Sequence, residues 1–464
     1  MTSPPEKDLT PPDSARQVLR EVLKLAYPIM MGYASTTLMY FVDALMVGRL
    51  GKTELAAVST SGVIVFTVIA LASGVASCVN TFASQSLGRN RPQDCAAYAW
   101  QNAYFAAGSG LLALAFVPTL PWLFAWIGHS PALQTCEVSY GRIRLGGMGF
   151  MVAAWGFCSY FQGVHRPWVA TITTLAVNVV NVVANYALIF GHWGFPRMGV
   201  AGAAWATIIA AALQCVMLVA VILHPWHART FGGWDACRFD WAKLKQLVHI
   251  GWPAGINFFL DIASWAIFTN FFMGQFGEDA IAGNMVAMQY MHLSFMPAVG
   301  LSHATAALVG RYLGQQDVPR AKQRAYAALR LALGYMLFMG VMFYLFRYPM
   351  VRLFNTDPGV VEVAATILIF AAVFQGFDAF GIVSSGALRG AGDTHWTAAA
   401  TVLLCWFVFV PGAWFFAYKM PQLGAKGPWF ACTAYICLLG TTLFIRFKSE
   451  RWSKIDIFGG KTEA

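Results

Sequence analysis

The chain has 464 residues, of which 58% are hydrophobic and only 11% are charged, and its formal net charge is +10. Soluble domains carry about 25% charged residues, so this composition excludes an ordinary soluble enzyme and indicates a protein that crosses a membrane many times. The positive charge does not indicate nucleic-acid binding, because the basic residues stand in short loops between apolar segments, the pattern that sets orientation in a membrane.

The chain begins with a polar, proline-rich segment that lacks the apolar stretch of a signal peptide. Residues 1–24 are therefore predicted to be a cytoplasmic N-terminal tail. The nine cysteines lie mostly inside apolar segments and include no Cys-x-x-Cys pair. We interpret them as small core residues rather than disulfides or metal ligands, and we expect no structural metal.

Twelve apolar segments follow, each long enough to cross a bilayer as a helix. Those of the first half are predicted at 25–48, 56–84, 98–127, 132–161, 167–190 and 199–224. The polar segment 225–246 is predicted to be a cytoplasmic linker. Those of the second half are predicted at 247–274, 280–309, 325–346, 360–387, 395–418 and 425–446. Residues 447–464 are predicted to be a cytoplasmic C-terminal tail.

The two halves repeat each other at an offset of 225 or 226 residues. The corresponding segments include 46–57 with 272–283, 86–89 with 312–315, and 199–202 with 424–427. Each half contains six spans, an even number, so both halves start on the same side of the membrane. This predicts parallel repeats related by an axis along the membrane normal, with a substrate path between an N-lobe at 25–224 and a C-lobe at 247–446.

The basic residues predict the orientation. With the N-terminus in the cytoplasm, 21 basic residues fall on the cytoplasmic side and nine on the outer side or at outer helix ends. Because basic residues accumulate on the cytoplasmic side, both termini are predicted to be cytoplasmic.

Three of the 21 acidic residues lie well inside predicted spans, namely Asp43, Asp261 and Asp378. A carboxylate at the centre of a span costs about 2.5–3.5 kcal/mol on insertion scales, so such residues indicate function. Asp261 and Asp378 belong to the second lobe. If they converge in a cavity of low dielectric, a proton, a metal cation or an organic cation must accompany them. The alternative is that they face different cavities and never interact.

Asp43 has candidate partners in the span at 167–190, where Asn178, Asn181 and Asn185 occur. Asn181 and Asn185 are four residues apart and share a helix face. An aspartate that faces two amides can hold a proton, a sodium ion or water. The alternative is a structural carboxylate that joins neighbouring helices. Asp357 precedes Pro358, which is typical of a helix N-cap, and a contact with ligand near the outer mouth is the less favoured interpretation.

The order and spacing of these motifs resemble the multidrug and toxic compound extrusion (MATE) family, and within it the NorM-like branch. The similarity extends from about Leu19 to Phe447. The matching segments are 28–43, 47–48, 54–59, 251–253, 276–279, 374–378, 387–390 and 423–427. The NorM-like branch usually has Glu where this chain has Asp261, and some relatives place an aromatic residue where this chain has Ser294, with Tyr290 one turn earlier.

The resemblance implies an all-α membrane protein with two six-helix bundles in a V shape. It implies export of amphipathic, often cationic compounds, driven by sodium ions or protons, with no enzyme activity and no cofactor besides the coupling ion. Asp261 and Asp378 would form the C-lobe site for cation and drug, and Asp43, Asn181 and Asn185 the N-lobe cation site. Asn178, Tyr290 and Asp357 are possible accessory residues. We expect a monomer in the bacterial inner membrane, with small organic cations, the coupling ion and lipid as partners and without nucleic acid.

Two other classes remain open at this point. A lipid-linked precursor flippase of the same fold superfamily would use a large basic cavity, whereas this chain has few Arg or Lys residues within its spans. A membrane-embedded enzyme would need a catalytic set at the membrane surface, such as an Asp-rich metal motif, and no such set occurs in the predicted loops.

Overall fold

A computed structural model describes residues 13–458, and these residues are almost entirely helical. The first half contains α1 (Ala15–Gly48), α2 (Lys52–Ser77), α3 (Val79–Gly88), α4 (Pro92–Phe116), α5 (Leu120–Ile127), α6 (Pro131–Gly146), α7 (Met148–Gly163), α8 (Pro167–Phe190) and α9 (Val200–Leu223). The second half contains α11 (Trp241–Ile267), α12 (Glu278–Gly314), α13 (Val318–Arg352), α14 (Pro358–Ala391), α15 (Thr394–Leu404), α16 (Val410–Lys419) and α17 (Lys426–Lys448). The short helix α10 (Pro225–Phe231) lies between the halves.

The described part of the chain contains eleven helical segments long and apolar enough to cross a membrane. Each of them coincides with one of the predicted spans, so the all-α, multi-pass fold is confirmed. The remaining predicted span, at 132–161, is formed by α6 and α7 and does not belong to the eleven. Its first helix carries the charged residues Glu137, Arg142 and Arg144.

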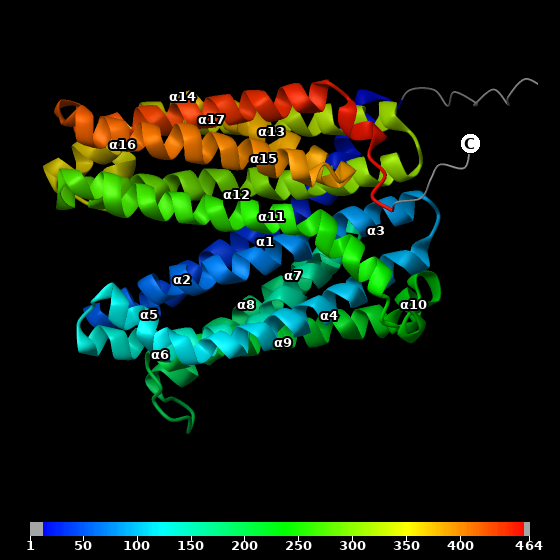
Figure 1. Ribbon diagram of the computed structural model, residues 1–464, viewed down its shortest axis with the longest axis horizontal. Helices are drawn as coiled ribbons and strands as arrows, with labels where there is room; N and C mark the ends of the chain where they lie inside the picture. The colour runs from blue at the N-terminus through cyan, green and yellow to red at the C-terminus, as the bar shows by residue number, and fades with distance from the viewer. Residues whose placement is uncertain (1–12, 459–464) are drawn as a thin grey trace, which may run out of the picture.

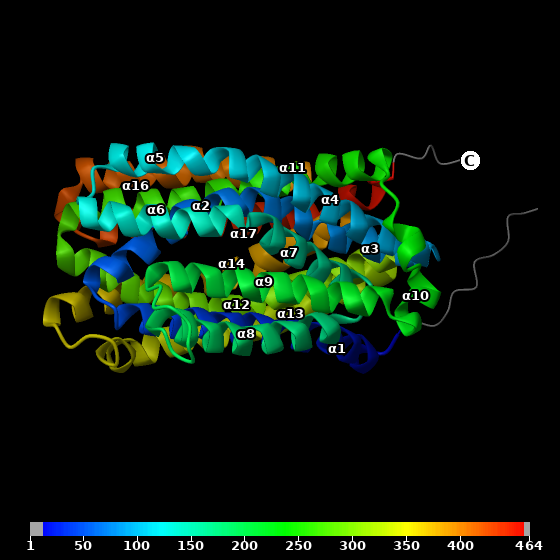
Figure 2. The same ribbon diagram turned by 90° about the horizontal axis from the view of Figure 1, so that it is seen from below.

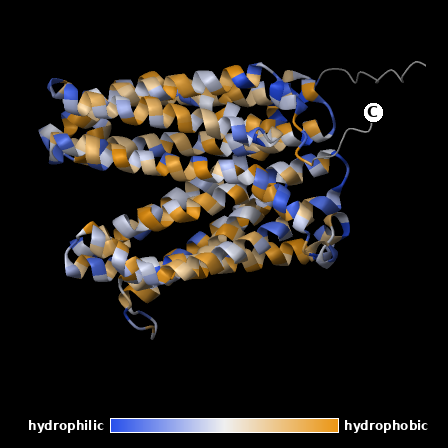
Figure 3. Cartoon of the chain, in the orientation of Figure 1, coloured by the Kyte–Doolittle hydropathy of each residue, from blue (hydrophilic) through white to orange (hydrophobic). Residues whose placement is uncertain are grey.

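The helices form two lobes that converge at the end where the chain termini lie and diverge at the opposite end (Figure 1). Figure 2 shows that most helices run along the long axis of the molecule. Hydrophobic residues cover the helix shafts, and hydrophilic residues gather mainly at the two ends (Figure 3). This is the V shape that the resemblance implies, and we call the convergent end the closed end.

The repeat is visible in the element boundaries. Helices α2, α4 and α9 begin at Lys52, Pro92 and Val200, and their counterparts α12, α13 and α17 begin 226 residues later. The internal helices therefore keep the spacing that the sequence motifs predict.

An exchange of helix ends holds the closed end together. The first turns of α1, with Val22, Leu25 and Ile29, are buried in a core cluster that α12, α13, α14 and α17 complete. Reciprocally, Leu247 and Ile250 of α11 are buried in a cluster formed mainly by α3, α4, α7 and α9. Because each lobe inserts one helix end into the apolar core of the other, burial of this surface stabilises the closed end.

The predicted tail and linker differ from the structure. Helix α1 begins at Ala15, where Ser14 and Gln17 form a capping box, so residues 15–24 are helical rather than a tail, while residues 1–12 lie outside the described part. The segment 225–246 contains α10 and the first turn of α11. Both segments are folded for the same reason: each carries apolar side chains that are buried in the core clusters.

The C-terminal segment after α17 crosses to the first lobe. The Arg89 guanidinium lies 2.9 Å from the Asp456 carboxylate and 4.2 Å from the Phe458 ring centroid. Gln246 donates from Nε2 to the carbonyl of Phe458 at 3.1 Å, and Ile457 is buried in the first-lobe core cluster. The described end of the predicted C-terminal tail is therefore a strap across the closed end.

Helix α10 places a buried histidine outside the membrane spans. His227 is fully buried, with Nδ1 2.8 Å from Arg166 Nη1 and Nε2 2.7 Å from the Tyr160 hydroxyl. Burial, and secondarily the Arg166 charge, lowers the pKa of His227 from 6.5 to about 4. The folded chain therefore keeps this ring neutral at a pH where the unfolded chain protonates it.

We expect the protein to lose stability as the pH falls from 6.5 to 4, because only the unfolded state binds the proton over this range. His227 alone contributes about 3 kcal/mol to the loss. Thermal unfolding in detergent across this range measures the slope, and His227→Gln should reduce it. Burial lowers the pKa of His165 to about 4 as well, so part of the slope should remain. An unchanged slope in the variant would contradict the prediction.

Candidate functional site

Helix α11 carries the first of the predicted second-lobe carboxylates. The helix begins at the N-cap Asp240, whose side chain accepts from the backbone N–H groups of Ala242 and Lys243. Asp261 lies about six turns further on, where it is half-buried, and the Trp265 side chain donates a hydrogen bond to its carboxylate. One turn earlier, the side-chain oxygen of Asn257 is buried and has no hydrogen-bond partner within the described residues. The i, i+4 spacing puts this oxygen on the same helix face as Asp261.

Asp378 lies in α14 and is half-buried as well. The two carboxylates are close enough for the charge of one to act on the other. Tyr435 and Cys432, on α17, lie within electrostatic range of both carboxylates. The structure therefore brings the two aspartates into one neighbourhood in the interior of the second lobe, as the interacting alternative requires.

Two helices near the second-lobe carboxylates contain π-helical turns. The segment between α15 and α16, Cys405–Phe409, is π-helical, and so is the continuation of α11 at Phe268–Met273. π-Helical turns interrupt the regular side-chain spacing and occur frequently at functional sites. Cys405 lies within range of the Asp261 charge and hydrogen-bonds Ser264, so one of these turns lies near Asp261.

Neither Asp261 nor Asp378 forms an ion pair with a basic residue in the described part of the chain. Their polar surroundings are oxygen atoms, an indole and thiols rather than cations. Next to Asp378, Gln375 donates from Nε2 to the hydroxyl of Ser294 at 2.9 Å, and both side chains are buried. An acidic pair without a fixed counter-charge can attract an inorganic cation, a proton or an organic cation.

The first-lobe residues also meet. Asn185 donates from Nδ2 to the Asp43 carboxylate at 2.6 Å and to Asn181 Oδ1 at 3.1 Å. Asn181 and Asn185 are fully buried, and Asp43 is half-buried. Asn181 Nδ2 and Asn185 Oδ1 have no partner among the described residues. The asparagines share a face of α8, as their spacing predicts, and Asn185 holds Asp43 of α1 in place.

The possible accessory residues have structural partners. Asn178 donates to the Ser35 hydroxyl at 2.8 Å, which joins α8 to α1. The Tyr290 hydroxyl donates to the carbonyl of Met350 at 2.6 Å. Asp357 caps α14 and accepts from the backbone N–H of Gly359 at 2.8 Å, so the N-cap interpretation is confirmed.

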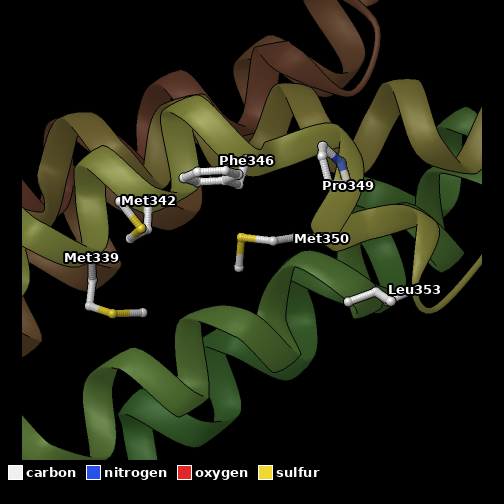
Figure 4. A pocket seen from close by; sticks show the side chains of 6 residues that line it. All are labelled: Met339, Met342, Phe346, Pro349, Met350 and Leu353. Carbon is white, nitrogen blue, oxygen red and sulfur yellow. The ribbon is translucent and has the colours of Figure 1, made fainter.

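An apolar cavity of about 450 Å³ lies elsewhere, at the kink of α13 (Figure 4). Met339, Met342, Phe346, Pro349, Met350 and Leu353 line it. None of the predicted site residues contributes to it, and its lining side chains include no charged or hydrogen-bonding group that could bind a cation. The acidic residues therefore remain the candidate functional site, and this cavity is not part of it. Among the described residues, no group of three or more His, Cys, Asp or Glu side chains could hold a metal ion.

Several site neighbours could not be identified from the sequence. Trp265, Cys432 and Tyr435 look like ordinary apolar positions of membrane helices. Arg144 is the exception, because a basic residue inside the predicted span at 132–161 is itself a signal of function. Its charge acts on Asp43, so it belongs to the first-lobe polar cluster.

A two-lobed bundle of membrane helices with carboxylates in its interior is the architecture of a secondary transporter. The MatE family model matches residues 28–187 and 253–415, more than half of the chain, and the chain therefore belongs to the MatE family.

Similar proteins agree with this assignment. "Probable multidrug resistance protein NorM" of Thermotoga maritima is 28% identical over 456 residues, which cover 97% of this chain and 96% of that protein. "Multidrug resistance protein PmpM" of Pseudomonas aeruginosa is 30% identical over 405 residues, with 85% and 83% covered. These relatives confirm the resemblance to the NorM-like branch.

Solved structures confirm the fold. A MATE transporter of Vibrio cholerae, VcmN, has a TM-score of 0.86 at 17% identity, covering 96% of this chain and 99% of that chain. A MOP superfamily transporter of Pyrococcus furiosus has a TM-score of 0.85 at 20% identity, covering 95% and 98%.

Proposed function

We propose that this chain is a cation-coupled antiporter that exports amphipathic, often cationic compounds by alternating access, with a sodium ion or a proton as the coupling ion. The observation that carries the proposal is the interacting pair Asp261 and Asp378, which has no basic partner in the described part of the chain. The relatives' names as multidrug resistance proteins support the substrate class.

The proposed mechanism is competition for one acidic site. Two carboxylates in a medium of low dielectric cannot both be charged without a cation nearby. A drug cation that enters from the cytoplasm supplies the missing charge. When the site opens outward, a proton or sodium ion replaces the drug, which loses its counter-charge and leaves. At 100 mV, each inward elementary charge contributes about 2.3 kcal/mol, which is about a 50-fold gradient.

The proposed mechanism requires a conformational change at the closed end. Export requires this end to open, so the exchanged ends of α1 and α11 must leave the opposite lobe or tilt with it. We place both termini in the cytoplasm of a bacterium, with the protein in the inner membrane, on the strength of the basic-residue bias. In that orientation the divergent end faces outward.

The proposal is tested by reconstituting the full chain in proteoliposomes and following ethidium under separate sodium and proton gradients. We expect ethidium to move against one of these gradients and to stop when an ionophore collapses it. Equal movement without any gradient would contradict coupling. Flipping of a lipid-linked precursor by the same vesicles, without ethidium transport, would assign the protein to the flippase class instead.

A further inference from the structure

The strap that follows α17, residues 449–458, is fixed to the second lobe at its start. Trp452 is fully buried in the core cluster that α12, α13, α14 and α17 form. Its ring centroid lies 5.4 Å from that of Phe447, and its indole N–H donates to the Phe447 carbonyl at 2.7 Å. Glu450 forms an ion pair with Lys322 of α13. The beginning of the strap therefore belongs to the second lobe in packing as well as in sequence.

The end of the strap is bound by the first lobe, towards which it runs in Figure 1. The Phe458 ring packs edge-on against Phe82 of α3 and Tyr98 of α4, with centroids 5.8 Å and 6.2 Å apart. Arg89, at the end of α3, lies over the same ring and pairs with Asp456. Aromatic pairs and cation–π contacts are favourable beyond the area they bury. The first lobe therefore has a docking site for the last described residues, made of two aromatic rings and one cation.

Ile457 lies in the seam between the lobes. Its side chain is buried and belongs to the first-lobe core cluster. On the second lobe it contacts Gly392, in the turn between α14 and α15, so closely that a Cβ atom on this glycine would collide with Ile457 Cγ2. Ile457 therefore fills a space whose walls come from both lobes, and this space opens when the lobes part.

The strap is too short to follow the lobes far apart. Only four peptide units separate Trp452 from Asp456, and an extended chain of this length spans at most about 14 Å. Trp452 is fully buried, whereas the side chains of Arg89 and Asp456 are each 36% exposed. Because a partly exposed ion pair contributes little stability compared with a buried apolar side chain, the contacts with the first lobe are the ones that break on opening.

We propose that the strap is a releasable latch, in which the segment Asp456–Phe458 docks on the first lobe while the closed end is shut and detaches each time that end opens. This inference rests on the proposed alternating access and adds to it an element that favours the state closed at this end. Weakening the docked contacts shifts the balance towards the open state, and fixing them permanently stops the cycle.

Pairs of cysteines joined by a short, reducible bis-thiol reagent in detergent, before reconstitution, test the release. One pair, Arg89→Cys with Asp456→Cys, links the strap to the first lobe. The matched pair, Lys322→Cys with Glu450→Cys, replaces the other ion pair of the strap and links it to its own lobe. Linking the first pair should stop ethidium export until the reagent is reduced, and linking the matched pair should leave export unchanged.

Equal export by the two linked proteins would overturn the latch. Absence of ethidium export by the untreated wild type would instead count against the proposed function. The wild type treated with the same reagent controls for reaction at its native cysteines.

Two of those native cysteines report on opening without any transport assay. Cys78 is buried where α2 meets α3, and its Sγ lies 3.9 Å from the carbonyl of Ile250, on α11 of the other half. Cys95 is fully buried within the first lobe, where its Sγ lies 3.2 Å from the carbonyl of Ala83. Opening of the closed end exposes Cys78, whereas Cys95 reacts only if the first lobe itself loosens.

Phe458→Ala should raise the rate at which N-ethylmaleimide alkylates Cys78 about tenfold, which is a shift of about 1.4 kcal/mol towards the open state. Peptide mass spectrometry of the purified full chain measures the rate at each cysteine. Cys95 should react at the wild-type rate, and the control Glu450→Gln should change neither cysteine. An unchanged Cys78 rate in Phe458→Ala, or an equal rise at Cys95, would contradict the latch, and this result decides even if the cysteine pairs do not fold.

Discussion

Replacing Asp261 or Asp378 with Asn is expected to lower gradient-driven export of ethidium by about 100-fold, two tenfold steps of about 1.4 kcal/mol each. Asn has nearly the same shape as Asp, but it can neither carry a negative charge nor bind a proton at neutral pH. The exchange of drug for ion therefore loses its common ligand. Export by proteoliposomes of matched protein content measures the effect.

Asp240→Asn is the control for this prediction. Asp240 lies on the same helix as Asp261, but its carboxylate caps α11 at the convergent end, and Asn caps a helix about as well as Asp. The control should export ethidium at the wild-type rate. If Asp261→Asn and Asp378→Asn both match the control, the assignment of the second-lobe site is wrong.

Gly88→Ala is expected to reduce stability by about 1–3 kcal/mol, the usual cost of inserting atoms into a packed core. A Cβ atom at Gly88, in α3, would lie 2.8 Å from the Cα of Gly314 and against the carbonyl of Arg311, both in α12. The two lobes would have to separate at this crossing. The midpoint of thermal unfolding in detergent measures the loss.

Gly108→Ala is the control for this prediction, and it is expected to change stability in the opposite direction. Gly108 lies inside α4, and a Cβ atom there would meet nothing within 4 Å. Alanine is favoured over glycine inside a helix by about 0.5–1 kcal/mol, so this variant should be slightly more stable. An unfolding midpoint for Gly88→Ala equal to that of Gly108→Ala would show that the crossing of α3 and α12 tolerates the added methyl group.

The membrane spans and the repeat were predictable because they depend on local chemistry. Long apolar segments must form helices in a bilayer to satisfy their own backbone groups, so the runs containing Asp43, Asp261 and Asp378 could be recognised one at a time. The i, i+4 spacing of Asn181 and Asn185 is likewise a local property, and their hydrogen bond follows from it. The offset between the halves is a sequence property as well, and it reappears in the starts of α2, α4 and α9 and of their counterparts α12, α13 and α17.

Contacts between distant segments were not predictable. A tryptophan, a cysteine or a tyrosine in an apolar span has the same local appearance whether it faces lipid or a carboxylate, so Trp265, Cys432 and Tyr435 emerged only from packing. The folded segment at 225–246 and the strap around Asp456 were missed for a related reason. Their polar composition is typical of exposed loops, and the apolar residues that anchor them are few.

The amino-acid sequence is enough to identify a multi-pass helical membrane protein of two related halves with three carboxylates inside its spans, because these properties depend on composition and on spacing along one chain. Which charges lie near one another became clear from the folded structure alone. It brought Asp261 to Asp378, placed Arg144 within range of Asp43, and inserted the first turns of α1 into the opposite lobe. The physical reason is that electrostatic and packing energies depend on distances in space between residues far apart in the chain, and local patterns carry no information about those distances.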